Sequence, residues 1–202
     1  MPQVPFDYLI SSFVTLLLVV EPVGLAPIFV ALTEGLPASA RREVALRSCI
    51  ITAGILLGAT LVGDWLLHQL GISLAAFRIA GGLLLFSNAY EMVMGVRIER
   101  QSKAAEQALE EHVRYMAAFP LAIPLMAGPG AITATILLAG HTGGRPLYIG
   151  SLIAIIIAVA SVCLIVYLIA DQIGKALGIT GNVVLSRVLG VVLAALAAQF
   201  VI

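Results

Sequence analysis

The feature that most constrains this chain is a set of six long apolar stretches separated by short polar segments. They cover residues 8 to 33, 46 to 67, 73 to 95, 116 to 139, 146 to 170 and 181 to 202. A bilayer core about 30 Å thick is crossed by roughly 20 helical residues, so each stretch is long enough for one transmembrane helix. The sequence therefore predicts an all-α membrane protein with six transmembrane helices.

The composition agrees with a lipid environment. Of the 202 residues, 61% are hydrophobic and 11% are charged, whereas soluble domains average about 45–50% and 25%. Eleven basic and eleven acidic residues balance, so the chain has no basic surface for nucleic acid. Residues 1 to 8 contain no Lys or Arg, so we expect no cleaved signal peptide and a first span that is retained. The lipid bilayer is the expected partner, and nucleic acid is not.

Basic residues near the span ends predict the orientation. Lys and Arg in short loops stay on the cytoplasmic side of a membrane. All but one of those near the span ends follow spans one, three and five: Arg41, Arg42, Arg47, Arg97, Arg100, Lys103, Arg114 and Lys175, with Arg145 alone on the opposite side. We therefore expect a multi-pass protein of the cell inner membrane with both termini outside and a cytoplasmic linker at residues 97–115.

The two halves of the chain repeat. A shift of 107 residues places Pro22 on Pro129 and Asp64 on Asp171, and a two-residue insertion then places Arg78 on Arg187. Each half holds three spans, an odd number, so the second half must enter the membrane upside down. Inverted repeats of this kind recur in transporters. The sequence predicts one membrane domain built from two inverted three-helix repeats, residues 1–96 and 116–202.

Helices 1 and 4 are expected to be broken near mid-membrane. Pro22 and Pro27 lack amide donors and flank Gly24, and the fourth span carries Pro124, Gly128, Pro129 and Gly130. Backbone groups freed in this way must line a cavity rather than face lipid. The half-helix that restarts after each break offers N-terminal amides to an anionic group. The alternative is that these prolines only kink packed helices.

Glu21 lies near the centre of its span, where an ionised acid is unfavourable by about 2.5–3.5 kcal/mol. One hypothesis is that a small amino acid places its carboxylate at the amides of Gly130 and Ala131 and its ammonium near Glu21. A second is that Glu21 binds a proton, and a third is that it bonds freed backbone amides for structural reasons. We also place Thr133, in the second half-helix, in the predicted substrate site.

Other polar residues inside the spans predict further contacts. Asp64 and Arg78 are each seven residues from Gly71, and Asp171 and Arg187 are each eight from Ile179. The two residues of each set should lie at similar depth in the membrane, which predicts two structural or gating ion pairs, Asp64 with Arg78 and Asp171 with Arg187. The alternative is that each side chain reaches the membrane interface by snorkelling.

Span three and span two each carry a further pair of interest. Asn88 and Glu91 share a face of span three. We expect them either to line a solute pathway or to lie in an interface between helices. Gly54 and Gly58 allow close helix approach within one subunit or in a homo-oligomer.

Motifs of enzymes and metal sites are absent from the sequence. His68, His112 and His141 fall in different loops, and no HExxH, GxSxG, P-loop or GxGxxG pattern occurs. We expect no enzymatic activity, no cofactor and no metal.

Two blocks closely resemble the signature regions of the MarC family: FVTLLLVVEPVGLAPIFVALT at 13–33 and FPLAIPLMAGPGAITATI at 119–136. The similarity extends over nearly the whole chain, including FRIAGGLLLF at 77–86. The resemblance implies transport of small neutral amino acids such as alanine or glycine, often outward. It also implies a central site made of Glu21, Pro22, Gly24, Pro27, Pro124, Gly128, Pro129 and Gly130. Many relatives carry Asp where this chain has Glu21.

The sequence thus predicts a secondary transporter of small solutes that works by alternating access, with proton coupling left open. One alternative is a membrane scaffold or regulatory protein that transports nothing. Another is a drug or ion efflux pathway, which would be expected to have a more aromatic lining than the Gly, Pro and Ala of the central motifs.

Overall fold

A computed structural model of the chain describes residues 6–97, 99–100, 117–142 and 145–202. The elements are α1 (Phe6–Val20), α2 (Pro22–Leu32), α3 (Ala38–Gln69), α4 (Leu74–Met94), the π-helical segment η2 (Ala117–Met126), α6 (Pro129–Gly140), α7 (Pro146–Leu168) and α8 (Ala170–Val201). No strand occurs in the described residues, which confirms the all-α prediction. Most of the predicted linker, residues 97–115, lies outside the described residues.

Four helical stretches are long and apolar enough to cross a bilayer: Phe6–Leu32, Ala38–Gln69, Pro146–Leu168 and Thr180–Val201. The chain is therefore a multi-pass membrane protein. The third and fourth predicted spans correspond in position to α4 and to η2 with α6. They are not among the four, because α4 carries Arg78, Asn88 and Glu91 and α6 has only 12 residues. The count of six spans stays a prediction.

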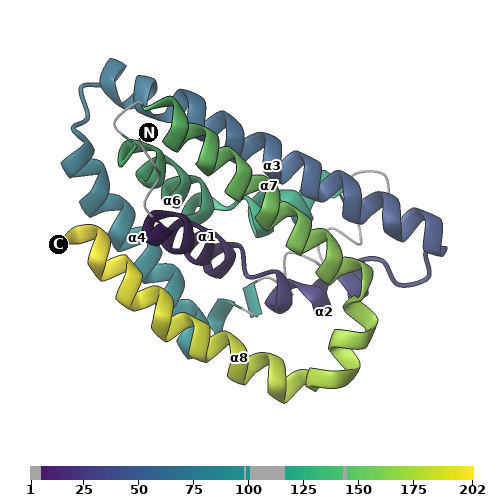
Figure 1. Cartoon of the computed structure of the whole chain (residues 1–202). Coiled ribbons are helices and arrows are strands. Elements are labelled where there is room, and N and C mark those ends of the chain that lie inside the picture. Colours follow the sequence, from purple (N-terminus) through teal and green to yellow (C-terminus); the bar gives the residue numbers. More distant parts are fainter. Residues whose placement is uncertain (1–5, 98, 101–116, 143–144) are drawn as a thin grey trace.

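The interrupted helices lie inside the molecule. Figure 1 shows α1, α2 and α6 between the pair α3 and α7 and the pair α4 and α8, with the start of α1 and the end of α8 at one end. Along Phe6–Leu32, 61% of the most apolar window is buried, against 28–39% for the other three spans. Because the broken span is the most enclosed by protein, its open backbone groups are shielded from acyl chains.

The first predicted break is present, and its depth in the membrane stays a prediction. α1 ends at Val20, Glu21 adopts a left-handed conformation with φ 53° and ψ 57°, and α2 begins at Pro22. Proline is favoured at the first helical position because its missing N–H would be unpaired there anyway. α2 continues through Pro27, so this second proline does not end the helix.

The second predicted break is present as well. η2 ends at Met126, Gly128 is extended with φ −72° and ψ 172°, and α6 begins at Pro129. A Cβ atom on Gly128 would lie 2.6 Å from the carbonyl oxygen of Pro124, so this close approach requires glycine.

The two predicted ion pairs are wrong. Asp64 lies 3.8 Å from His68 of its own helix, and Arg78 donates from Nε to the carbonyl oxygen of Phe200 at 3.3 Å. Asp171 pairs with Arg41, and Arg187 lies beside Gly95 at the end of α4. Equal distance from a turn sets the depth of two residues, but it does not set the direction in which each side chain leaves its helix.

Gly54 and Gly58 lie on an exposed face of α3, and no described atom comes within 4 Å of a Cβ atom built at either position. The alternative of close helix approach within one subunit is therefore wrong for the described residues. Their use in a homo-oligomer stays a prediction.

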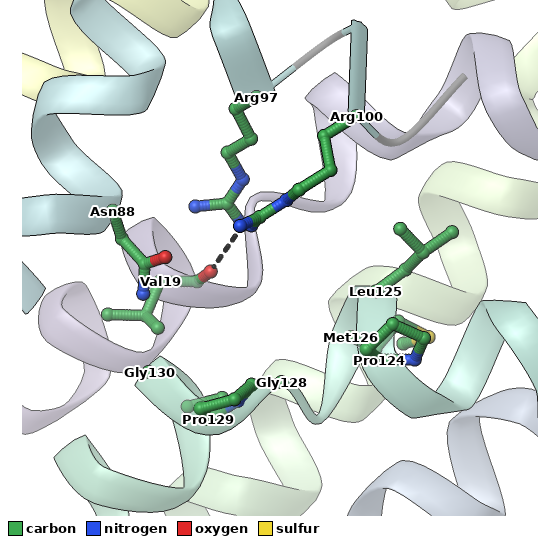
Figure 2. Close-up of a pocket in the computed structure, with 11 residues that line it drawn as sticks. Val19, Asn88, Arg97, Arg100, Pro124, Leu125, Met126, Gly128, Pro129 and Gly130 are labelled. Atoms are coloured by element: carbon green, nitrogen blue, oxygen red, sulfur yellow. Dashed lines mark hydrogen bonds between the residues drawn. The ribbon is translucent and has the colours of Figure 1, made fainter. Parts of the chain in front are cut away.

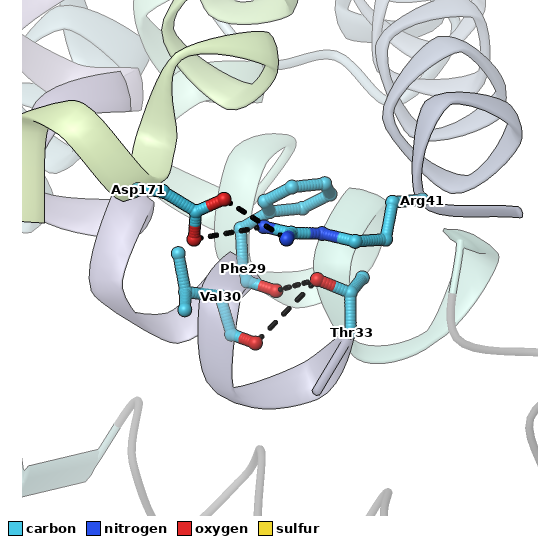
Figure 3. A network of polar contacts seen from close by, with 5 residues as sticks. All are labelled: Phe29, Val30, Thr33, Arg41 and Asp171. Atoms are coloured by element: carbon cyan, nitrogen blue, oxygen red, sulfur yellow. Dashed lines mark hydrogen bonds and ion pairs between the residues drawn. The ribbon is translucent and has the colours of Figure 1, made fainter. Parts of the chain in front are cut away.

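Arg41 and Asp171 form a polar cluster that joins the starts of α3 and α8. Arg41 donates from Nη1 and Nη2 to the two carboxylate oxygens at 2.9 and 3.2 Å (Figure 3). The guanidinium also lies 5.9 Å from the centre of the Phe29 ring. Phe29 stacks on Tyr167 with ring centres 4.7 Å apart, so the cluster links four helices.

Asp171→Asn is expected to reduce the free energy of unfolding by at most about 1 kcal/mol at pH 7, because the pair is partly exposed to solvent. The hydrogen bonds from Arg41 lower the pKa of the Asp171 carboxyl below its ordinary value. The stabilisation of the fold by this ion pair is therefore present above the pKa of the carboxyl in the unfolded chain, about 3.9. It is lost as the pH falls through the lower pKa of the carboxyl in the folded protein. Thermal unfolding of the purified protein in detergent measures the difference. Asp64→Asn is the control, and equal effects of the two variants at pH 7 would contradict the assignment.

Candidate functional site

A cavity of about 280 Å³ lies where the end of α1, the end of α4 and the break between η2 and α6 come together (Figure 2). Its wall contains two arginines, one asparagine and the backbone of the second helix break. The lining residues are Val19, Asn88, Arg97, Arg100, Pro124, Leu125, Met126, Gly128, Pro129, Gly130 and Ala131.

The predicted site residues divide between this cavity and the core. Those of the second half line the cavity, namely Pro124, Gly128, Pro129, Gly130 and Ala131, and Asn88 joins them from α4. Those of the first half do not line it: Glu21, Pro22 and Gly24 are buried in the core and Pro27 is exposed. Thr133, which is 6% exposed, packs against Gly81 instead.

Glu21 forms a buried ion pair with Arg97. Their side chains are 3% and 6% exposed, and Nε of Arg97 lies 3.3 Å from Oε2 of Glu21. Arg97 also donates from Nη2 to the carbonyl oxygen of Val19 at 2.9 Å (Figure 2). The last carbonyls of a helix have no partner inside that helix, so Arg97 satisfies one that the break leaves open.

Gly24 makes room for this carboxylate. A Cβ atom there would lie 2.7 Å from Cδ of Glu21. Gly24 lies inside α2, so the backbone is not unwound at this position. It serves the site by letting the side chain of Glu21 fold back over the first turn of α2.

The Glu21–Arg97 pair keeps unused hydrogen-bonding capacity. Within the described residues, Oε1 of Glu21 and Nη1 of Arg97 are buried without a hydrogen-bond partner. An unpaired buried polar atom is unfavourable by about 1–3 kcal/mol, and by more if it is charged. Because Arg97 lines the cavity, a bound anion could satisfy its free donor.

Arg100 is the second cation of the cavity. It donates from Nη1 to Oε1 of Glu91 at 2.9 Å. Glu91, predicted to line a pathway, lies outside the cavity lining and instead pairs with Arg100. Sequence reasoning assigned both arginines to the linker because they follow the apolar stretch. Gly95, with φ 81°, is the signal that could have located them, since a left-handed glycine ends α4 and redirects the chain.

The start of α6 adds a second anion-binding feature. No side chain caps this helix, so the first amides after Pro129, those of Gly130 and Ala131, have no partner within their helix. Both residues line the cavity, and a helix N-terminus carries a partial positive charge. With Glu21 and Glu91 each paired to an arginine, the cavity suits a small anionic group.

Comparisons with known proteins extend over the whole described chain. The family model described as MarC family integral membrane protein matches residues 6–202. A UPF0056 membrane protein of Archaeoglobus fulgidus is 35% identical, covering 96% of this chain and 91% of its own length. The UPF0056 membrane protein YhcE of Escherichia coli is 34% identical, covering 100% and 94%. No solved structure matches. The sequence blocks, the helical membrane fold and these matches agree, and the chain belongs to the MarC family of integral membrane proteins.

Proposed function

We propose that this protein is a secondary transporter of small neutral amino acids that works by alternating access between two inverted three-helix repeats. One observation carries the proposal. The first residues of α6, which no side chain caps, line the same cavity as Arg97, whose Nη1 is buried without a hydrogen-bond partner within the described residues. That arrangement suits the carboxylate of a small solute.

In this proposal the carboxylate binds the amides of Gly130 and Ala131 and Nη1 of Arg97. The ammonium lies toward the amide oxygen of Asn88, which faces the cavity from α4 (Figure 2). Glu21 does not line the cavity, so we assign it to Arg97 as a counter-ion rather than to the substrate. If transport is coupled to protons, protonation of Glu21 would release Arg97 from the ion pair, and deprotonation would hold it there.

The helix contacts support the inverted repeat. Exchange of α2 with α6, α3 with α7 and α4 with α8 converts each of the main contacts among these six helices into another that exists. The contact of α2 with α8 corresponds to that of α6 with α4, and the contact of α2 with α7 corresponds to that of α6 with α3. α4 with α8 and α3 with α7 map onto themselves, as expected for helices beside a twofold axis.

The size and lining of the cavity favour a small solute over a drug. Cavities for drug-sized ligands measure about 300–1,000 Å³ and are rich in aromatic side chains. This cavity measures about 280 Å³, and its described lining contains no aromatic residue. We further propose an inner-membrane location with both termini outside and export as the physiological direction.

Gly130→Ala is expected to lower the initial rate of alanine counterflow in proteoliposomes by about tenfold or more. A Cβ atom there would collide with Nδ2 of Asn88 and would obstruct the amides, and losing hydrogen bonds to a charged group weakens binding by about 1.5–3 kcal/mol. Gly150→Ala is the control, because a Cβ atom built there meets no described atom within 4 Å.

Counterflow is measured with and without a proton gradient, using radiolabelled glycine and alanine. Wild-type exchange above that of protein-free vesicles supports the proposal. If the wild-type protein exchanges none of the small neutral amino acids, a scaffold function becomes the better account.

A further inference from the structure

A second cavity of about 260 Å³ lies at the end of the molecule that carries the start of α1 and the end of α8. It opens between the start of α1, the start of α4 and the ends of α6 and α8. Its polar lining residues are Tyr8, Ser11, Ser12, Thr15, Arg78, His141 and Gln199. Nothing in the function proposed above uses this cavity.

The two cavities lie on the same faces of three helices. On α1, Thr15 lines the second cavity and Val19, one turn further, lines the first. On α6, Leu138 and Ala131 stand two turns apart and line the second and first cavity respectively. The two cavities therefore lie one beyond the other along the same faces of α1 and α6.

α4 continues this alignment. Arg78, Gly81, Leu85 and Asn88 follow one another at spacings of three and four residues, so they share one face of the helix. Arg78 lines the second cavity and Asn88 the first, separated by about 15 Å at 1.5 Å per residue. Leu85 between them is fully buried. Packed side chains thus separate the two cavities.

The floor of the second cavity has free polar groups. Ser12 and Thr15 are fully buried, and within the described residues their hydroxyls have no hydrogen-bond partner. Buried hydroxyls in an apolar core are normally bonded. Neither hydroxyl is exposed in this structure, so the two hydroxyls are available to a polar ligand once the cavity opens toward them.

Arg78 gives the second cavity a positive charge. Its bond to the carbonyl oxygen of Phe200 uses Nε and leaves both Nη groups outside that bond. The other polar walls are held in place, because Tyr8 donates to the carbonyl oxygen of Leu138 and Nδ1 of His141 lies 2.8 Å from that of Leu137. No acidic residue is among the described lining residues. The chemistry fits a small solute that bears a carboxylate.

We propose that the Arg78 cavity is the opposite mouth of the same pathway and holds the solute carboxylate on that side of the membrane. The choice of an amino acid as ligand rests on the function proposed above, whereas the place of the mouth does not. Alternating access then consists of opening the Leu85 region toward one cavity while the other closes.

Cysteine modification tests this proposal without any transport assay. Thr15→Cys is made in a Cys49→Ala, Cys163→Ala background and reconstituted in nanodiscs, where both faces are reachable. Thr135→Cys is the control, because Thr135 is as fully buried as Thr15 but bonds to the carbonyl oxygen of Ala131 and lines neither cavity. Ser12→Cys is the second reporter if Thr15→Cys does not fold.

We expect a sulfonate-bearing methanethiosulfonate reagent to modify Thr15→Cys about tenfold faster than its trimethylammonium analogue, because Arg78 attracts the anion. Arg78→Gln should remove this preference. Alanine at ten times its Kd should slow modification about tenfold, whereas alaninamide, which lacks the carboxylate, should not.

Folded Thr15→Cys that reacts no faster than Thr135→Cys would overturn the proposal. So would modification that shows no charge preference, or that alanine leaves unchanged. If alanine protects the cysteine but counterflow fails, the binding mouth stands and the transport function does not.

Discussion

Arg97→Gln is expected to lower the free energy of unfolding by about 3–5 kcal/mol, because it leaves the carboxylate of Glu21 buried without its counter-ion. Glu21 is 3% exposed and its other carboxylate oxygen already lacks a partner within the described residues. The carbonyl oxygen of Val19 also loses its donor. Denaturant titration of the purified protein in detergent measures the loss.

The double variant Glu21→Gln, Arg97→Gln is expected to recover most of this stability, since replacing both charges removes the uncompensated one. Arg100→Gln is the matched control. Its partner Glu91 is partly exposed, at 21%, so its loss should stay below about 1 kcal/mol. A double variant no more stable than Arg97→Gln would show that the two residues are not a coupled pair.

Gly128→Ala is expected to destabilise the protein by about 1–3 kcal/mol through overpacking and to reduce counterflow by about tenfold or more. The added Cβ atom would lie 2.6 Å from the carbonyl oxygen of Pro124. That neighbour is backbone, so relief requires a shift of η2 against α6, and the residues on both sides of the break line the cavity.

Gly58→Ala provides the comparison for this prediction. A Cβ atom there meets no described atom within 4 Å, and alanine is a better helix former than glycine by about 1 kcal/mol. We expect unchanged counterflow and equal or slightly higher stability, measured by the same denaturant titration. If Gly128→Ala behaves like Gly58→Ala, the close approach at the break has no functional importance.

Local sequence rules predicted the helix breaks. Pro22 and Pro129 each begin a helix because proline lacks the amide that continuation would require. The residues beside the second break could be assigned to the cavity from the sequence for the same reason, because their backbone forms part of the cavity wall.

Contacts that depend on helix rotation could not be read from the sequence. Asp171 pairs with Arg41, which lies 130 positions away in the chain, because the packing of α8 and α3 decides which faces meet. Arg97 was missed because charge beside an apolar stretch is typical of a loop. Its burial depends on the turn at Gly95 and on an acid, Glu21, that no sequence spacing connects to it.

Equilibrium binding of radiolabelled alanine to the purified protein tests most directly whether the cavity at the helix breaks holds a solute through Arg97. We expect saturable binding to the wild-type protein and an affinity at least about tenfold lower in Glu21→Gln, Arg97→Gln, which keeps the fold but lacks the guanidinium. Wild-type protein that binds no alanine, or a double variant that binds it equally well, would contradict this account.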